Sequence, residues 1–552
     1  MGTATLTTFI IYLVGMLALG IIGYRLTNNL SDYFLGGRKL GPGVAALSAG
    51  ASDMSSWLIL GLPGAIYLGG FGSAWLAVGL TIGAYLNWQF IAKRLRIYTE
   101  VSSDAITLPD FLEKRFRDNS RLLRSASAAV ILIFFTVYVA SGLVGGAVLF
   151  SNTFGYDYMV ALLIGGLVII AYTFLGGFIA VSWTDFIQGI LMFLALIVLP
   201  FVAISELGGW SETIRVVGEL SEGSHLNMIQ GVSTLAIISS LAWGLGYFGQ
   251  PHILARFMAI RSHKDVPTAR LIGMSWMVFS LFGAIFVGIA GFAYIGTEAV
   301  QSELANRGIE ASMDGGMLML ANEEAVFIAI TQLLTHPVVA GVLLAAILAA
   351  IMSTVDSQLL VSSSAVAEDF YKGFFRKNAS NKELIWVARI SVIVIALIAL
   401  IIASDDESRV LELVANAWAG FGASFGPIVV LSLFWKRLTR NGALAGVIIG
   451  AVTVLTWDQF DPFGGLYSLV PGFLFATLAA VLVSIGGKSS GLISGLLVIL
   501  FWSFINPIEG IFSIVLMLAV GAIVAVLVGM NKSKPNQEVQ DEFNKVQEML
   551  KS

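Results

Sequence analysis

Hydrophobic residues along this chain form long runs that are separated by short polar segments. A helix needs about 20 mostly apolar residues to cross the hydrocarbon core of a bilayer. The pattern predicts thirteen such spans, near residues 5–24, 42–69, 72–92, 123–151, 157–175, 183–204, 231–255, 271–295, 324–365, 384–403, 410–434, 441–458 and 465–485. The ninth is too long for one straight crossing. A further apolar stretch, 490–529, is interrupted at Asn506 and Pro507, so we expect a two-helix hairpin there.

The loops between these spans alternate in charge. Lys and Arg follow the first, third, seventh, ninth and eleventh spans, and those after the seventh begin with Arg256. Acidic loops lie between them, at 206–222, 298–324 and 405–407. Because cytoplasmic loops are enriched in Lys and Arg, the alternation predicts that the N-terminus lies outside the cell.

The end of the chain fixes the expected helix count. Lys532 and Lys534 favour a cytoplasmic C-terminus, which requires about fifteen transmembrane helices, thirteen plus the hairpin. We therefore expect one transmembrane domain over residues 1–530 and a cytoplasmic tail over 531–552.

Composition agrees with a membrane protein. The 552 residues are 57% hydrophobic and 12% charged, whereas soluble domains are about 45–50% apolar and about 25% charged. A net charge of −4 gives no indication of a nucleic-acid partner. The absence of cysteine excludes disulfides and thiolate chemistry, and we find no nucleotide motif, metal cluster or catalytic triad that would indicate an enzyme.

Asp53 lies in the middle of the second predicted span, in the segment 50–57 (GASDMSSW), which is followed by 61–64 (GLPG). A charge near mid-membrane is costly and usually marks an ion or substrate pathway. The small residues, glycines and proline suit a helix that breaks halfway, which frees carbonyls for a cation and amides for a carboxylate. The alternative is a kinked helix in which Asp53 makes an internal polar contact.

The seventh span carries a second candidate interruption, at 241–251 (LAWGLGYFGQP), whose glycines and proline disfavour a continuous helix. Trp243 and Tyr247 lie one turn apart on one face, where they would wall an apolar pocket. Helix packing or an interfacial aromatic belt would also explain them, although belts lie at span ends. The two interrupted spans are five apart, which indicates inverted five-helix repeats at about 42–204 and 231–434 with a binding site between them.

Hydroxyl groups line one face of the ninth span. Ala350, Ser353, Thr354 and Ser357 are spaced so that they share one side of a helix. Hydroxyls and a carbonyl there would give uncharged oxygen ligands of the kind that sodium prefers. Serine and threonine in membrane helices also bond back to the preceding turn, so the spacing alone leaves both interpretations open. Asp356 would line an exit path or pair with a helix end.

These motifs resemble the solute:sodium symporter family. The matching segments are 36–42 (GGRKLGP), 51–55 (ASDMS), 61–64 (GLPG), 135–142 (FTVYVASG), 176–188 (GGFIAVSWTDFIQ), 243–256, 352–354 (MST) and 440–446 (RNGALAG). The resemblance runs from the first span to about residue 487, and the segment 243–256 is similar to the branch that carries proline. Ser56 stands where we expect glycine, and the stretch after residue 487 has no counterpart in shorter relatives.

The resemblance implies the leucine-transporter fold, an all-α polytopic membrane protein that holds sodium between the broken second span and the ninth span. The implied sodium ligands are the carbonyls of Ala51 and Met54 together with Ala350, Ser353 and Thr354. Arg38 and Asp53 would support sodium binding or coupling. The implied substrate contacts are Ser55, Ser56, Trp57, Tyr138, Trp243, Tyr247 and Pro251.

Asp185 opens the sixth predicted span. In some members of the family an acidic residue here is linked to a second sodium ion, which Ser357 would share. An aspartate in the first turn of a helix is also favoured by the helix dipole alone, so both interpretations stay open.

The resemblance implies a secondary active symporter that imports L-proline with sodium across the bacterial cytoplasmic membrane. Another small carboxylate or a sugar would suit the same fold. A transporter-like sensor usually carries a long soluble domain, and only residues 531–552 follow the last apolar stretch. In that tail, Val539, Phe543, Val546 and Leu550 predict an amphipathic helix, either on the membrane surface or docked to a partner.

Overall fold

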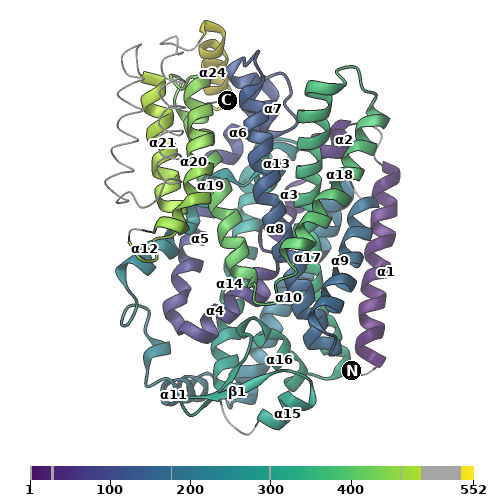
Figure 1. The fold of residues 1–552 in the computed structure, drawn as a ribbon, viewed down its shortest axis with the longest axis vertical. Coiled ribbons are helices and arrows are strands. Elements are labelled where there is room, and N and C mark those ends of the chain that lie inside the picture. The colour runs from purple at the N-terminus through teal and green to yellow at the C-terminus, as the bar shows by residue number, and fades with distance from the viewer. Residues whose placement is uncertain are drawn as a thin grey trace.

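A computed structural model of the chain describes residues 3–26, 30–175, 177–296, 300–461, 463–485 and 536–551. Long helices run between the two ends of an elongated bundle, with the N-terminus at one end and the C-terminus at the other (Figure 1). Within these described ranges, nine helices are long and apolar enough to cross a membrane. The stretch 490–529, for which we expect a hairpin, lies outside the described residues.

The first part of the chain, up to residue 220, is mostly helical within the described ranges. Its elements are α1 (Thr3–Leu26), α2 (Leu30–Leu35), η1 (Gly36–Arg38), α3 (Pro42–Asp53), η2 (Trp57–Gly61), α4 (Leu62–Gly69), η3 (Gly70–Ala74), α5 (Trp75–Leu86), η4 (Asn87–Ala92), α6 (Lys93–Val101), α7 (Leu108–Phe116), α8 (Leu122–Phe154), α9 (Tyr158–Leu175), α10 (Phe178–Glu206) and α11 (Trp210–Leu220).

The second part adds further helices and one small hairpin. The helices are η5 (Ser224–Leu226), α12 (Thr234–Ala242), η6 (Trp243–Gly249), α13 (Pro251–Ala259), η7 (His263–Asp265), α14 (Val266–Ile295), α15 (Gln301–Asn306), η9 (Glu323–Ala325), α16 (Val326–Leu334), α17 (Pro337–Ser364), η10 (Ala365–Phe375), α18 (Asn381–Ile402), α19 (Val410–Phe434), α20 (Arg440–Phe460), α21 (Leu469–Ile485) and α24 (Gln537–Met549). The antiparallel strands β1 (Ala311–Asp314) and β2 (Met317–Leu320) pair Ala311 with Leu320.

Local chemistry sets many of these helix boundaries. The side chains of Thr107, Ser233, Ser380 and Thr439 each accept a backbone N–H of the following first turn, which satisfies a donor that the helix itself leaves unpaired. Pro337 begins α17, because proline suits the first turn of a helix. The long predicted span 324–365 is therefore divided into α16 and α17, as its excess length required.

Both predicted interruptions are confirmed. α3 ends at Asp53, a π-helical segment begins at Trp57, and regular α-helix resumes at Leu62. In the seventh span α12 ends at Ala242, a tight 3₁₀ segment follows, and α13 begins at Pro251. α17 packs against α10, α8 and α3, while α19 packs against α8 and η6, so both interruptions lie inside the bundle.

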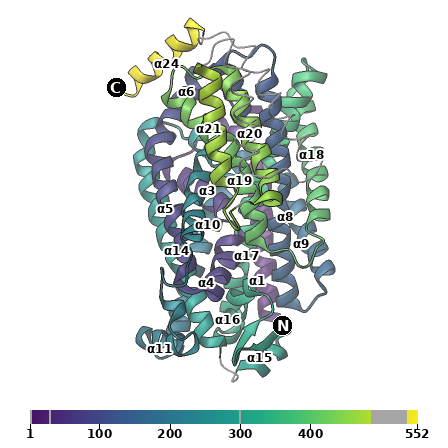
Figure 2. The same ribbon diagram turned by 60° about the vertical axis from the view of Figure 1, so that its left-hand side comes forward.

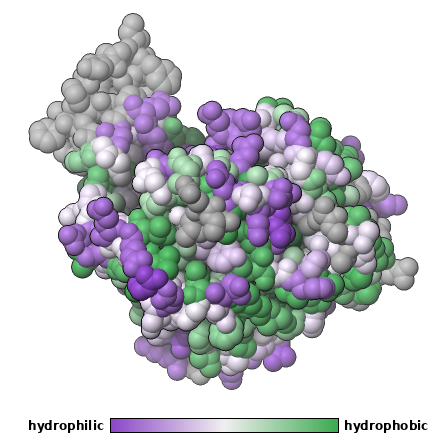
Figure 3. All heavy atoms as spheres, turned by 90° about the horizontal axis from the view of Figure 1, so that it is seen from below, coloured by the Kyte–Doolittle hydropathy of each residue, from purple (hydrophilic) through white to green (hydrophobic). Residues whose placement is uncertain are grey.

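The surface has the character expected of a protein in a bilayer. Large apolar side chains are exposed along the outer faces of several helices, for example Ile11 on α1, Phe201 on α10 and Ile401 on α18. Figure 3 looks onto the N-terminal end of the bundle and shows hydrophilic residues distributed over it among hydrophobic ones. The C-terminal amphipathic helix forms as predicted, as α24, and packs against α6 at the opposite end (Figure 2).

Candidate binding site between the broken helices

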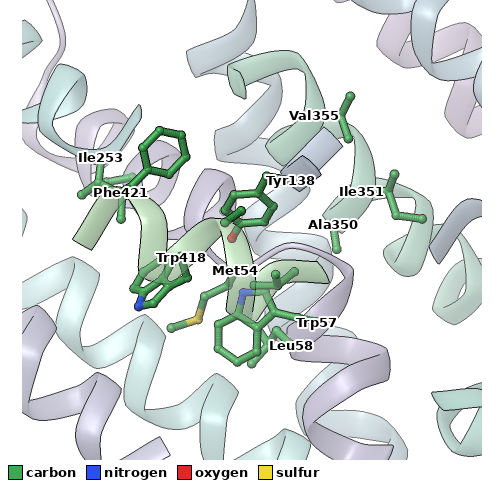
Figure 4. Close-up of a cluster of buried hydrophobic side chains, with 14 of the residues drawn as sticks. Met54, Trp57, Leu58, Tyr138, Ile253, Ala350, Ile351, Val355, Trp418 and Phe421 are labelled. Carbon is green, nitrogen blue, oxygen red and sulfur yellow. The ribbon is translucent and has the colours of Figure 1, made fainter. Parts of the chain in front are cut away.

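The break after α3 is organised around the backbone carbonyl of Asp53. This oxygen accepts hydrogen bonds from the Ser55 amide at 3.1 Å, the Trp57 indole at 3.1 Å and the Tyr138 hydroxyl at 3.3 Å. Trp57 and Tyr138 are buried, and Figure 4 shows both beside Met54. The Trp57 amide also donates to the Ser55 hydroxyl at 3.3 Å. Three of the expected substrate contacts are therefore held together by one unwound turn.

The hydroxyl face of α17 meets this same turn. The Ser353 hydroxyl donates to the Ala51 carbonyl at 2.9 Å, and the Thr354 hydroxyl donates to the same oxygen at 3.2 Å. The Ser353 hydroxyl also lies 3.2 Å from the Ala350 carbonyl. Ala51, Ala350, Ser353 and Thr354, four of the five expected sodium ligands, are thus joined by hydrogen bonds. The fifth, Met54, is the C-cap residue of α3 and directly follows Asp53.

Asp53 and Tyr247 join the two broken helices. The Tyr247 hydroxyl donates to the Asp53 carboxylate at 2.6 Å, and the Tyr247 carbonyl accepts from the Asn87 side chain at 2.9 Å. The side chains of Asp53 and Tyr247 are both buried. Asp53 therefore makes an internal polar contact, as the alternative interpretation of its position in the sequence predicted. This contact lies between the two broken helices, at the centre of the candidate site.

A small cavity borders this contact. It has a volume of about 20 Å³ and is lined by Asp53, Met54 and Tyr247 together with residues of α3, α5, α13 and α14. Such a volume holds about one water molecule. A cavity of this size admits no larger molecule, so the space between the broken helices is closed at this point of the structure.

Trp243 lies in an aromatic stack that sequence reasoning did not find. Its ring stacks on Tyr467, with centroids 5.4 Å apart, and on Trp418, at 6.2 Å. The Trp418 indole donates to the Trp243 carbonyl at 2.8 Å, and its ring meets Tyr247 edge-on. Trp418 and Tyr467 come from α19 and from the loop before α21, and Gly246 of η6 makes room for the Trp418 indole, because a Cβ atom at Gly246 would clash with it.

Ser56 and Pro251 occupy the edges of the two interruptions. A Cβ atom at Gly145 of α8 would come within 2.8 Å of the Ser56 side chain, so Gly145 makes room for the serine that stands where we expect glycine. Pro251 begins α13 and is buried, with no backbone N–H to satisfy at the helix start. The serine is therefore accommodated by α8.

Arg256 and Asp185 form a buried ion pair, which corrects two predictions. Arg256 lies in α13 with its side chain fully buried, and not in a loop, because its guanidinium donates to Asp185 at 3.1 Å and to Ser48 at 3.1 Å. It also contacts the hydroxyl of Ser357. Asp185 lies about two turns inside α10 and not in its first turn, so the helix dipole does not explain it.

Asp356 and Arg38 make hydrogen bonds to groups other than the Ala51 carbonyl. Asp356 is fully buried beside Ser357, which donates to it at 3.3 Å. Arg38 donates to Asp104 at 2.8 Å, to the Ala105 carbonyl at 2.8 Å and to the Met258 carbonyl at 2.7 Å. Arg38 therefore joins the loop after α6 to the end of α13, and it does not contact the expected sodium ligands.

The sequence matches a known family over most of its length. The profile of the sodium:solute symporter family matches residues 33–450. The chain belongs to the sodium:solute symporter family. It is 52% identical over 488 residues to the sodium/proline symporter of Escherichia coli (strain K12), a match that covers 88% of this chain and 94% of that protein. It is 50% identical over 470 residues to the high-affinity proline transporter PutP of Bacillus subtilis (strain 168), covering 85% and 95%.

Solved structures support the same fold. A Na⁺-coupled sialic acid symporter in a substrate-bound outward-open state aligns with a TM-score of 0.70 and 21% identity, over 88% of this chain and 98% of that one. Mhp1, a nucleobase-cation-symport-1 family transporter, aligns with a TM-score of 0.51 and 14% identity over 89% and 99%. The chain therefore has the helical architecture of the leucine-transporter fold, and its family consists of symporters and not enzymes.

Proposed function

We propose that this protein imports L-proline together with sodium ions by alternating access. The family and the proline transporters that are 52% and 50% identical to it support this function. The observation that carries it is the meeting of the Ser353 and Thr354 hydroxyls at the Ala51 carbonyl, beside the break in α3. Unwound carbonyls near the midplane of a transporter are the groups that coordinate a transported cation.

Sodium would be held by five oxygen atoms, from Ala51, Met54, Ala350, Ser353 and Thr354. In the closed structure the two hydroxyls donate to the Ala51 carbonyl. If a cation bound here, the two hydroxyl oxygens would coordinate it instead of donating to the Ala51 carbonyl. The cation would then hold α3 and α17 together in place of these hydrogen bonds. The Asp53 carboxylate lies two residues after Ala51 and would stabilise the positive charge.

The substrate would lie between the unwound turn of α3 and η6, in contact with Ser55, Ser56, Trp57, Tyr138, Trp243, Tyr247 and Pro251. Proline is a zwitterion with an apolar ring. Its carboxylate suits backbone amides at the start of a helical segment, where the helix dipole adds attraction. Its ring suits the stack of Trp243 and Trp418. Because the cavity at this point holds about one water molecule, η6 must move outward to admit proline.

Asp185 and Ser357 would act in coupling, through Arg256. The guanidinium of Arg256 already contacts both side chains, and it supplies the positive charge that a second sodium ion would bring. The Ser357 hydroxyl also donates to the Ser353 carbonyl at 2.9 Å. This arrangement connects the sodium site on α17 to α13, so loss of the ion would loosen the broken helix.

The proposed function includes an orientation in the bacterial cytoplasmic membrane. The N-terminal end of the bundle would face outside, and the end that carries α6, α7 and α24 would face the cytoplasm. The core would consist of inverted repeats over about 42–204 and 231–434, within one domain of about fifteen helices over 1–530. The cytoplasmic tail, 531–552, would include α24.

Uptake of radiolabelled proline into proteoliposomes tests this function. Uptake is expected to rise above the external concentration only when sodium is higher outside, and unlabelled proline should compete. Equal accumulation with and without the sodium gradient would contradict coupling. Sodium-driven uptake of a panel of sugars and other small carboxylates is measured in the same way. Accumulation of one of these compounds in the absence of proline accumulation would identify a different substrate.

A further inference from the structure

The helix α24 is fixed to the body of the transporter by a buried face. Val539, Phe543 and Val546 are 3%, 7% and 1% exposed, although the helix lies at the surface of the bundle (Figure 2). Its partner is α6, whose Lys93 ammonium also donates to the Leu550 carbonyl at 3.3 Å. The apolar stripe that was expected to meet a membrane or a partner is thus covered by this chain itself.

A buried carboxylate sets the position of α24. Glu542 is 9% exposed and forms an ion pair with Arg117 at 2.7 Å, and it accepts from the hydroxyl of Ser102. A buried charge is costly unless it is paired and hydrogen-bonded. Glu542 would therefore be unfavourable in any other register, which makes this a specific contact and not a general apolar association.

Phe543 completes an aromatic enclosure around Arg115. The Arg115 guanidinium is fully buried, with its central carbon 5.0 Å from the ring of Tyr98, 5.1 Å from Phe116 and 5.7 Å from Phe543. Such cation–π contacts strengthen when the cation is removed from water. Arg115 also donates to the Ser432 carbonyl at 3.5 Å. Removal of α24 would expose this charge and loosen the contact between α7 and α19.

The segment that receives α24 also holds the ends of both broken helices. Arg38, just before α3, is bound to Asp104 and Ala105 of this segment and to Met258 at the end of α13. Leu40 forms an isolated β-bridge with Ile260, which follows α13, and the Leu40 amide donates to the Ala259 carbonyl at 3.2 Å. Opening of this end for substrate release must break these contacts.

We propose that α24 is a strap that stabilises the state closed toward the cytoplasm, by bracing the segment 93–118 against the ends of α3 and α13. This inference rests on the proposed function and orientation. α24 lies beyond residues 33–450, the range that matches the family profile. α24 carries four acidic residues and one lysine, and one of the four, Glu542, pairs with Arg117, which favours this intramolecular site over an anionic lipid surface.

Cysteine accessibility tests the strap, because the chain has no native cysteine. Ala105→Cys places a thiol at a fully buried position under Arg38, and Asn119→Cys provides an exposed reference in the same region. Both are labelled with a maleimide in inside-out vesicles, with and without Phe543→Ala. Asn544→Ala, on the exposed side of α24, is the matched control.

With Phe543→Ala, labelling at position 105 is expected to rise roughly tenfold, which corresponds to about 1.4 kcal/mol in the closed–open equilibrium. Labelling at position 119 and the Asn544→Ala control should not change. Arg117→Glu should act like Phe543→Ala, and adding Glu542→Arg should restore slow labelling. An unchanged rate at position 105 in Phe543→Ala, or no rescue by the charge exchange, would overturn the strap. Neither result depends on proline, so failure of the strap is separate from failure of the proposed function.

Discussion

The hydroxyl of Tyr247 donates a 2.6 Å hydrogen bond to the carboxylate of Asp53, and this contact joins the two broken helices inside the bundle. Asp53 Oδ1 has no hydrogen-bond partner among the described residues. The tyrosine hydroxyl is therefore a main source of stabilisation for a carboxylate that is 3% exposed. Separation of the helices would transfer this carboxylate to water or to a cation, so we propose that this bond takes part in coupling sodium to substrate.

Tyr247→Phe removes this bond and keeps the ring. Because a buried acceptor without its donor costs about 1–3 kcal/mol, we expect proline transport to fall by roughly 5- to 150-fold. Uptake by Asp53→Asn, Tyr247→Phe and the double variant measures the interaction. The double variant should be no worse than the poorer single one, because both changes remove the same contact. Additive losses would show that the two residues act separately.

Ser353→Ala and Thr354→Ala each remove one oxygen from the proposed sodium site. We expect the sodium concentration for half-maximal uptake to rise, while proline affinity at saturating sodium changes little. Ser362→Ala is the control, because its buried hydroxyl donates only within α17, to the Gln358 carbonyl at 2.8 Å. Unchanged sodium dependence in both test variants would remove this face of α17 from the sodium site.

Trp243→Ala removes the proposed aromatic wall for the proline ring. Loss of an enclosed aromatic surface costs about 2–3 kcal/mol, which corresponds to an affinity loss of about 30- to 150-fold. Sodium binding without substrate should change much less. Trp210→Ala is a suitable comparison, because Trp210 lies in α11 and its ring packs edge-on against Phe286, outside the aromatic stack of Trp243. Normal apparent affinity for proline in Trp243→Ala would make this residue a packing residue.

Asp185→Ala leaves the buried Arg256 guanidinium without its charged partner. Breaking a buried ion pair in this way costs about 3–5 kcal/mol, so the variant should melt at a lower temperature in detergent. Asp185→Leu with Arg256→Met replaces the ion pair by apolar groups and should recover part of the stability, because the buried Asp356 then loses the guanidinium with which it also interacts. If the pair acts in coupling, the stable double variant still loses sodium-driven accumulation. Full accumulation by the double variant would show that the pair is only structural.

The orientation is tested with two exposed positions in loops that are predicted to lie on opposite sides of the membrane. Ser211→Cys lies in α11, at the N-terminal end in Figure 1, and Ser380→Cys lies just before α18. In intact cells an impermeant thiol reagent should label position 211 and leave position 380 unlabelled until the membrane is opened. The opposite pattern would contradict the orientation inferred from the charged loops.

The sequence by itself determined the features that depend on near neighbours in the chain. An apolar run of about 20 residues is long enough to cross a bilayer, so the long apolar helices could be located from the pattern of apolar residues along the chain. The break after Asp53 and the break at 243–250 followed from glycine and proline, which weaken the interior of a helix. The common face of Ala350, Ser353 and Thr354 followed from helical spacing.

Only the tertiary structure decided which distant residues meet. Arg256 was counted as a loop charge because its partner Asp185 lies 71 positions away in the sequence, and the cost of burying a charge is offset only by that partner. In the same way, Gly145 makes room for Ser56, and α24 covers α6 instead of a membrane surface. Each of these contacts joins residues that are far apart in the sequence and meet only when the chain folds. The spacing of residues along the chain therefore gives no signal for them.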